Sequence, residues 1–433
     1  MKYIKSFVCI ILVAVLFSGC SFRLASSVND LIFAISPYGD NADIKQAMDN
    51  YLGNGYSLKN PTSGEYITSY NFYDLDGDGV NEAIVFYETK DSLGIAKMAV
   101  LKQESDKKER WQVLTYVDGY GESAYRLDFS DIDNDGKTEI IVCWNSISNS
   151  TSHSLVLYDV DFENEAMLTQ IGEPKTINNY TIGDFYSNGT NQLLLFEILS
   201  GAKNSAKAEL YTVDDGYNLV SETRLDSRVL SYNNIVQEKT SAGLRVYADA
   251  ISSSGDSAFT EVIYYSNMYS SIVSPFFSYN SGTTTGTSRS CLIGSMDINS
   301  DNFVEIPTDA AYDALPKDIY SIDWKAYRNT VLVHTAYSLF VKNDGYTVVI
   351  PDSYFDKIKV EYDKQERELV VNSESDEFLF SIKPVLKAVY EEKTLDSYSV
   401  VCESNGYYYL AKTADNEKIK ITLDDLKQFV KIC

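Results

Sequence analysis

The chain has 433 residues and a formal net charge of −25, with 62 acidic side chains against 37 Lys and Arg. Its 44% hydrophobic and 23% charged residues are typical of a globular protein with a large core, and they exclude a largely disordered one. A field of this sign repels phosphate backbones, and no basic stripe offsets it, so we expect no nucleic-acid partner. The 34 tyrosines favour strands over helices.

The first twenty residues form a predicted export and lipidation signal. Two lysines precede an apolar run over 7–17, which is too short to span a membrane because a spanning helix takes about 20 residues. Phe17-Ser18-Gly19-Cys20 follows and resembles a bacterial lipobox. We therefore expect a lipoprotein signal peptide over 1–19 and a lipid on Cys20 that anchors the protein to the extracellular face of a bacterial cell membrane. An ordinary secretion signal with an incidental cysteine is the alternative.

Residues 20–55 are predicted to form a lipid-anchored tether and a short helix. The apolar residues of this helix share one face, and Gly53 ends it. They are Ile44, Ala47, Met48, Tyr51 and Leu52. From about residue 60, short apolar runs alternate with turns rich in Asp, Asn, Gly and Ser, a pattern that predicts consecutive strands.

A nine-residue acidic loop followed by an apolar strand recurs along the chain. Its copies lie at 74–82, 131–139, 184–192 and 297–305, and we number them loops 1 to 4. Their starts are 57, 53 and 113 residues apart, so a copy without its acids is expected near Gln237, halfway across the longest interval. A hairpin-like segment follows each loop, so each unit of about 55 residues holds some four strands, which is the size of a propeller blade.

We therefore predict an all-β propeller of four-stranded blades, with short N-terminal and C-terminal helices. The repeating blades are expected over 56–350. Residues 351–433 are expected to form the final blade or blades, or a small C-terminal cap, ending in a helix capped by Thr422.

Loops 1 and 2 have the ligand pattern of a calcium site. Each offers four carboxylates and, at its seventh position, a backbone carbonyl, and calcium takes six to eight oxygen ligands. The predicted ligands are Asp74, Asp76, Asp78, Val80 and Glu82 in loop 1, and Asp131, Asp133, Asp135, Lys137 and Glu139 in loop 2. Four carboxylates in one short loop repel one another unless a cation lies between them, and glycine at the sixth position permits the turn that folds them inward. We predict Ca²⁺ rather than Mg²⁺, which takes fewer ligands from protein.

The other two loops depart from this pattern. Loop 4 offers oxygen ligands from Asp297, Asn299, Asp301 and Glu305, but has asparagine in place of the sixth-position glycine, and both its filled and its empty state are left open. In loop 3, Tyr186 and Gln192 replace two of the acids, so we expect a metal-free turn there.

The DxDxDGxxE loop running into an apolar strand, repeated at blade spacing, resembles the FG-GAP/VCBS repeats of integrin-α-type β-propellers. The segment 59–66 ahead of loop 1 is also similar to a group of clostridial surface lipoproteins of unassigned function. The resemblance covers residues 55–310 and implies a propeller, with seven blades favoured and six as the alternative, in which calcium loops join the first two strands of a blade. It implies no reaction.

No catalytic motif is visible. The chain has no GxSxG, P-loop or GxGxxG sequence, and its two histidines, His153 and His334, are 181 residues apart. We therefore predict that it is not an enzyme but a calcium-stabilised surface protein that binds an unknown protein or glycan through the face opposite the loops. A carboxylate-pair glycosidase or lyase acting on extracellular polysaccharide is the alternative, and a structural module of an envelope complex is a second.

Overall fold

The computed structural model describes residues 40–433 apart from 54, 93, 104–110, 147–150, 164–166, 200–204, 313, 393–396, 405 and 415–419. The predicted signal peptide and Cys20 lie outside the described residues. Within them, no helix has both the length and the apolar character needed to cross a membrane.

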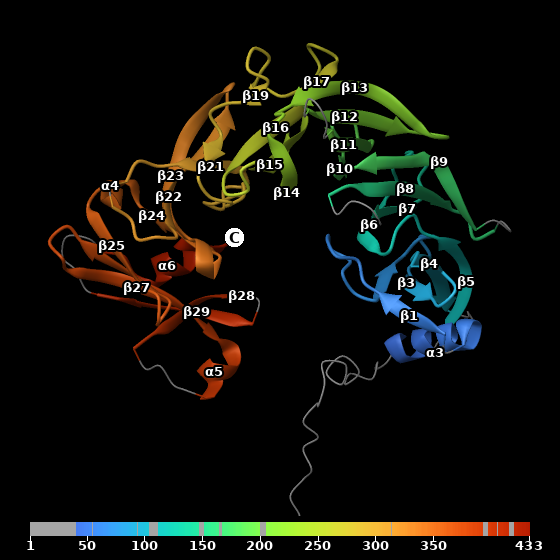
Figure 1. Cartoon of the computed structure of the whole chain (residues 1–433), viewed down its shortest axis with the longest axis horizontal. Coiled ribbons are helices and arrows are strands. Elements are labelled where there is room, and N and C mark those ends of the chain that lie inside the picture. Colours follow the sequence, from blue (N-terminus) through green and yellow to red (C-terminus); the bar gives the residue numbers. More distant parts are fainter. Residues whose placement is uncertain are drawn as a thin grey trace, which may run out of the picture.

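Six antiparallel sheets of four or five strands follow one another around an arc, and we number them blades 1 to 6 (Figure 1). Blade 1 contains β1 (Tyr56–Lys59), β2 (Tyr70–Tyr73), β3 (Glu82–Thr89), β4 (Lys97–Gln103) and β5 (Trp111–Asp118). Blade 2 contains β6 (Ala124–Ser130), β7 (Glu139–Asn145), β8 (His153–Val160) and β9 (Leu168–Ile177). Blade 3 contains β10 (Asn179–Gly183), β11 (Gln192–Leu199), β12 (Ser205–Val213) and β13 (Tyr217–Leu225).

Blade 4 contains β14 (Val229–Thr240), β15 (Gly243–Ser252), β16 (Ala258–Ser266), β17 (Ser271–Val273) and β20 (Ser288–Arg289). Blade 5 contains β21 (Glu305–Asp309), β22 (Ile319–Arg328), β23 (Val331–Val341), β24 (Tyr346–Ile350) and β30 (Val430–Ile432). Blade 6 contains β25 (Ile358–Asp363), β26 (Glu368–Ser373), β27 (Phe378–Leu386), β28 (Ser399–Ser404) and β29 (Tyr407–Thr413). A small hairpin of β18 (Phe277–Ser278) and β19 (Thr283–Thr284) lies beside blade 4 in the chain.

The helices are short: α3 (Asp40–Leu52), α4 (Asp352–Phe355), α5 (Lys387–Glu392), α6 (Leu423–Phe429) and the 3₁₀ turn η1 (Lys342–Asp344). The predicted all-β propeller with short terminal helices is thus confirmed. The described residues form six blades, the smaller of the two counts expected. The acid-free copy expected near Gln237 is the β14–β15 hairpin of blade 4.

In the early blades, the strand that follows the acidic loop begins with a run of buried residues because both of its faces are covered, by neighbouring blades in blades 2 and 3 and by blade 2 and α3 in blade 1. In β3 and β7 the first six residues are all buried, as are the first five of β11. A strand buried on both faces does not alternate between apolar and polar residues. Consecutive blades therefore share core clusters: Trp144 of blade 2, for example, packs edge-on against Phe86 of blade 1 at 5.6 Å between ring centroids.

The two ends of the arc are finished differently. On blade 1, α3 covers the outer face through Ile44 and Met48, both fully buried, whereas Tyr51 of the predicted apolar face is half exposed. On blade 6, the face away from blade 5 carries an ion pair between Lys412 and Glu368. Within the described residues, no strand of blade 1 pairs with a strand of blade 6. The blades are therefore held together through successive interfaces, and the C-terminal β30 returns to pair with β24 of blade 5.

Candidate functional site

The acidic loops occupy equivalent places in their blades. Loops 1, 2 and 3 join β2 to β3, β6 to β7 and β10 to β11, and loop 4 runs from the bridge at Met296 into β21 of blade 5. In all four, the sixth residue has the left-handed backbone that the turn requires, with φ between 67° and 93°. Asn302 adopts it in loop 4 as the glycines do elsewhere, since asparagine tolerates this conformation better than most residues.

Each loop folds its end residues inward by the same two hydrogen bonds. The sixth-residue N–H donates to the first acid, and the second-residue N–H donates to the last side chain. The first kind joins Gly79 to Asp74 Oδ2 (2.9 Å), Gly136 to Asp131 Oδ2 (3.2 Å), Gly189 to Asp184 Oδ2 (2.8 Å) and Asn302 to Asp297 Oδ2 (2.8 Å). The second joins Leu75 to Glu82 Oε2 (2.9 Å), Ile132 to Glu139 Oε2 (2.8 Å), Phe185 to Gln192 Oε1 (2.8 Å) and Ile298 to Glu305 Oε2 (3.1 Å).

These bonds use one oxygen of each end acid, and in five of the end acids the other oxygen has no hydrogen-bond partner. Among the described residues, the buried oxygens in this state are Asp74 Oδ1, Glu82 Oε1, Asp131 Oδ1, Glu139 Oε1 and Glu305 Oε1. The exceptions are Asp184 and Asp297, whose Oδ1 atoms accept from the N–H groups of Asn188 and Asp301, both at 3.0 Å. All three glutamates have 0% exposure. A buried carboxylate oxygen with no donor is costly unless a cation compensates it. The donor set, hard oxygens in a tight loop, therefore fits calcium.

The structure brings most of the predicted ligands together. Sets of ligand oxygens within 4.8 Å of one another are formed by Asp74, Asp76 and Asp78; by Asp131, Asp133 and Glu139; and by Asp297, Asp301 and Glu305. Of the predicted carboxylate ligands, Glu82 and Asp135 lie outside these sets: Glu82 Oε1 is 3.3 Å from Lys102 Nζ, and Asp135 accepts from the Lys137 N–H at 2.8 Å. The side-chain oxygen of Asn299 accepts from the Asp301 N–H at 3.0 Å. Val80 holds the expected seventh position of loop 1, its N–H donating to Asp78.

Loop 3 satisfies its own polar atoms. The Gln192 side chain, 1% exposed, accepts from Phe185 and donates through Nε2 to the Thr190 carbonyl at 2.8 Å. An amide can make both bonds, whereas a carboxylate can only accept. The expectation of a metal-free turn therefore has a physical basis in this loop.

The buried glutamates of loops 1, 2 and 4 have raised pKa values, because burial disfavours their charged form. Burial, and after it the neighbouring aspartates, raises the pKa of Glu139 and of Glu305 to about 7, and burial raises the pKa of Glu82 above its usual range. Burial together with Asp135, Asp131 and Asp159 also raises the pKa of Asp133. A cation in these loops would therefore displace protons.

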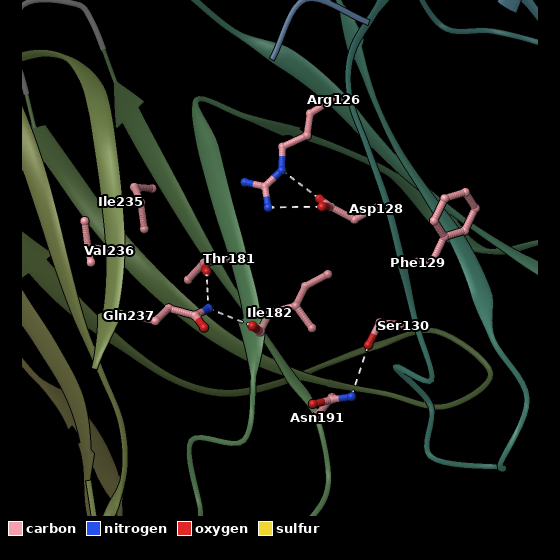
Figure 2. Close-up of a pocket in the computed structure, with 10 residues that line it drawn as sticks. All are labelled: Arg126, Asp128, Phe129, Ser130, Thr181, Ile182, Asn191, Ile235, Val236 and Gln237. Atoms are coloured by element: carbon pink, nitrogen blue, oxygen red, sulfur yellow. Dashed lines mark hydrogen bonds and ion pairs between the residues drawn. The ribbon is translucent and has the colours of Figure 1, made fainter. Parts of the chain in front are cut away.

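A central cavity of about 530 Å³ lies where the innermost strands of blades 2, 3 and 4 approach their loops (Figure 2). Arg126, Asp128, Thr181, Asn191 and Gln237 contribute polar groups to it. Asp128 is its one carboxylate and is paired with Arg126, with 2.7 Å between Nε and Oδ2. No local motif marked these residues, because strands about 50 residues apart bring them together.

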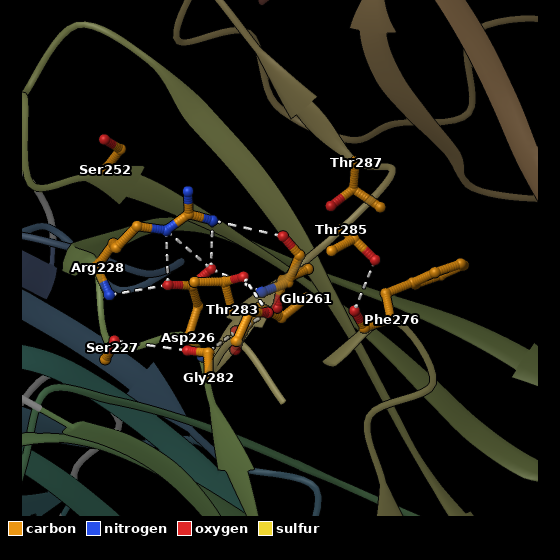
Figure 3. Close-up of polar contacts among 12 residues, drawn as sticks. Asp226, Ser227, Arg228, Ser252, Glu261, Phe276, Gly282, Thr283, Thr285 and Thr287 are labelled. Carbon is orange, nitrogen blue, oxygen red and sulfur yellow. Dashed lines mark hydrogen bonds and ion pairs between the residues drawn. The ribbon is translucent and has the colours of Figure 1, made fainter. Parts of the chain in front are cut away.

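A second cavity, of about 750 Å³, lies at the opposite end of blades 3 and 4. Its rim carries Tyr279, which is 73% exposed, and Phe277, with 5.1 Å between the ring centroids. Behind it, Asp226 and Glu261 are both fully buried, and Arg228 closes on Asp226 with 2.6 Å between Nη2 and Oδ2 (Figure 3).

This polar network fixes the 276–284 segment to blade 4. The Thr284 N–H donates to Asp226 at 2.7 Å, and its hydroxyl donates to Glu261 at 2.9 Å. Burial raises the pKa of Glu261 to about 7. The network accordingly supports the wall of the cavity that carries Phe277 and Tyr279.

No protein-family model and no curated protein matches the chain. Similar solved structures include the Dos1 propeller (10% identity, 81% of this chain and 67% of that chain, TM-score 0.31) and an α-L-arabinanase of Penicillium chrysogenum complexed with arabinobiose (12%, 83% and 98%, 0.31). An exo-β-1,3-galactanase from Phanerochaete chrysosporium is another (8%, 79% and 81%, 0.30). These likenesses concern the fold alone, and the resemblance to FG-GAP/VCBS repeats rests on the loop residues.

The prediction that the chain is not an enzyme is wrong, because it excluded every enzymatic function. An arabinanase and a galactanase are among the solved structures similar to this chain. The prediction relied on missing motifs. Two carboxyl groups of a glycosidase are brought together in space and leave no local motif, so the absence of motifs could not exclude such an enzyme.

Proposed function

We propose that the chain is a calcium-binding β-propeller in which ions hold together loops 1, 2 and 4. The observation that carries this proposal is the set of buried, unpartnered carboxylate oxygens on the end acids of these loops. In loop 3, where glutamine replaces the last acid, no such oxygen remains on its side chain. The pattern of orphaned oxygens thus follows the pattern of acids, which supports a ligand rather than an accident of packing.

Calcium would supply local positive charge that couples strand to strand. Its ligands come from both ends of each loop, so an ion bound between Asp131 and Glu139 joins the end of β6 to the start of β7. The lipobox-like segment at 17–20 and the resemblance to FG-GAP/VCBS repeats support an extracellular, lipid-anchored setting. Extracellular calcium modules work at about 10⁻⁴–10⁻³ M, an affinity that small exposed loops can supply.

Calorimetric titration of the full chain with calcium chloride, in detergent and after EDTA treatment, tests the proposal. We expect at least two equivalents to bind and the melting temperature to rise, because an ion that binds only the folded state stabilises it by about 2.7 kcal/mol per site at a hundred times its Kd. Magnesium at the same concentration should give a smaller rise. A melting temperature that is the same in calcium and in EDTA would refute the proposal.

A second candidate function is the binding or cleavage of a polysaccharide at the cavity opposite the loops. The observation that favours it is the exposed Tyr279 beside Phe277, with Lys207, Glu222 and Arg224 in the same lining. Binding to arabinan and galactan, and release of reducing sugar from them, should be measured for Tyr279→Ala. The matched control is Tyr269→Ala, because Tyr269 is also exposed (70%) but does not line the cavity.

A further inference from the structure

The strand that begins at the last residue of each acidic loop (β3, β7, β11 or β21) pairs with the next strand along the chain (β4, β8, β12 or β22). This partner strand places a different side chain opposite the last loop residue in each blade. The pairs Ala83–Leu101, Ile140–Tyr158 and Leu193–Tyr211 lie at the same register in blades 1, 2 and 3. One residue further toward the loop, the partner strands β4, β8 and β12 therefore carry Lys102, Asp159 and Thr212, respectively. In blade 5 the residue opposite Glu305 is Ala326. The same position thus holds a cation, an anion, a neutral polar group and a methyl group.

Lys102 lies among the acids of loop 1. Its ammonium pairs with Asp76, lies 3.2 Å from Asp78 Oδ2 and lies 3.3 Å from Glu82 Oε1. The last distance has no hydrogen-bond geometry, which agrees with Glu82 Oε1 being without a donor. The ammonium also packs 5.2 Å from the centre of the Phe162 ring of the neighbouring blade, which helps to hold it in place. Loop 1 therefore contains a positive charge of its own.

Loop 2 has the opposite arrangement. Asp159 takes the place of Lys102 and is close enough for its charge to act on Asp133. Within the described residues, no lysine, arginine or histidine forms an ion pair with Asp159 or with the acids of loop 2. Glu139 is fully buried and its Oε1 points into the loop with no donor. Loop 2 thus collects negative charge without an internal counter-charge.

We infer that Lys102 is a tethered counter-cation that holds loop 1 together without calcium and competes with calcium for it, whereas Asp159 makes loop 2 the tighter calcium site. The inference rests on the proposed function and concerns how that function is distributed between two loops with the same motif. Calcium affinity follows the charge of the ligand set, so a site with an added acid gains and a site with an added base loses. An ion can enter loop 1 only when the ammonium moves out, and this displacement costs part of the binding energy.

Calcium titration of Lys102→Met and Asp159→Asn tests this arrangement in the full chain. Methionine keeps the apolar stem of the lysine and removes its charge. We expect Lys102→Met to tighten the loop 1 site about tenfold and to leave the loop 2 site unchanged. We expect Asp159→Asn to weaken the loop 2 site about tenfold; each change is about 1.4 kcal/mol. The matched control is Lys97→Met on the same strand, because Lys97 pairs with Asp118 and not with a loop acid.

A second measurement does not depend on calcium. In EDTA, Lys102→Met should melt at a lower temperature than Lys97→Met, because the loop 1 acids lose their counter-charge. If calcium binds the unmodified protein but Lys102→Met changes neither affinity nor melting in EDTA, the tethered-cation inference is overturned while the proposed function stands. If calcium does not bind the unmodified protein, the proposed function fails and the competition fails with it.

Discussion

Replacing Glu139 with glutamine is expected to stabilise the metal-free protein and to abolish the stabilisation that calcium gives at loop 2. The chain supplies the precedent in loop 3, where Gln192 accepts from Phe185 and donates to Thr190. The variant should therefore keep the loop folded, remove a buried charge and lack the carboxylate that calcium needs. In EDTA at pH 7.5 we expect a gain of about 1–3 kcal/mol in the free energy of unfolding, the range for relieving an unsatisfied buried group.

The pH dependence of this gain has a defined sign. The pKa of Glu139 is raised to about 7 in the folded protein from the usual 4.5, so its contribution to stability is full below about pH 4.5 and is lost as the pH rises to about 7. The advantage of the glutamine variant in EDTA should therefore be small at pH 4.5 and large at pH 7.5. Urea unfolding at both pH values measures it, with Glu122→Gln at an exposed position as the control. A variant that is less stable in EDTA and still fully stabilised by calcium would contradict the prediction.

Replacing Asp249 with asparagine is expected to cost about 3–5 kcal/mol, because it leaves the buried guanidinium of Arg289 without its counter-charge. Both side chains are fully buried, with 2.8 Å between Nη2 and Oδ1. Asp249 also accepts hydrogen bonds from Asn234 at 2.7 Å, Thr260 at 2.6 Å and the Ser295 N–H at 2.6 Å. It therefore joins three strands of blade 4 to the connection that leads into loop 4.

The control for this prediction is a surface pair with the same chemistry. Lys359 and Asp376 are 2.6 Å apart, but their side chains are 49% and 75% exposed, so Asp376→Asn should change the free energy of unfolding by less than about 1 kcal/mol. Combining Asp249→Asn with Arg289→Met should recover part of the loss, since the stranded charge is removed. Equal and small effects of the two asparagine variants in urea unfolding would show that the buried pair does not stabilise blade 4.

The sequence predicted the features that short stretches of chain encode. The loop ligands are eight residues apart at most, and the apolar runs after them, such as 83–87, identify the strand that follows each loop directly. The acid-free copy was located by spacing alone. In the structure its Gly243 lies so close to the Phe185 carbonyl of loop 3 that a side chain there would clash. The β14–β15 turn of blade 4 thus packs against loop 3 at the position where blades 1, 2, 3 and 5 have an acidic loop.

The remaining features depend on pairings between distant residues. The sequence left residues 351–433 open between one or more blades and a cap, and the pairing of β30 with β24, about 84 residues earlier, could not be read from it. The central cavity joins Arg126, Thr181 and Gln237 from three blades. Lys102 looked like an ordinary strand residue, and only the register of β3 against β4 places it at loop 1.

An arc whose two ends are not joined by strand pairing behaves as a short solenoid rather than as a closed ring. Each blade then has at most two neighbours, so its stability is its own plus that of the interfaces it shares, and unfolding can begin at an end and advance blade by blade. Blade 1 is protected at its free end by α3, while blade 6 has a charged outer face and no acidic loop. We accordingly expect mechanical or thermal fraying to start at the C-terminal blade, and blades 1 and 2 to unfold last.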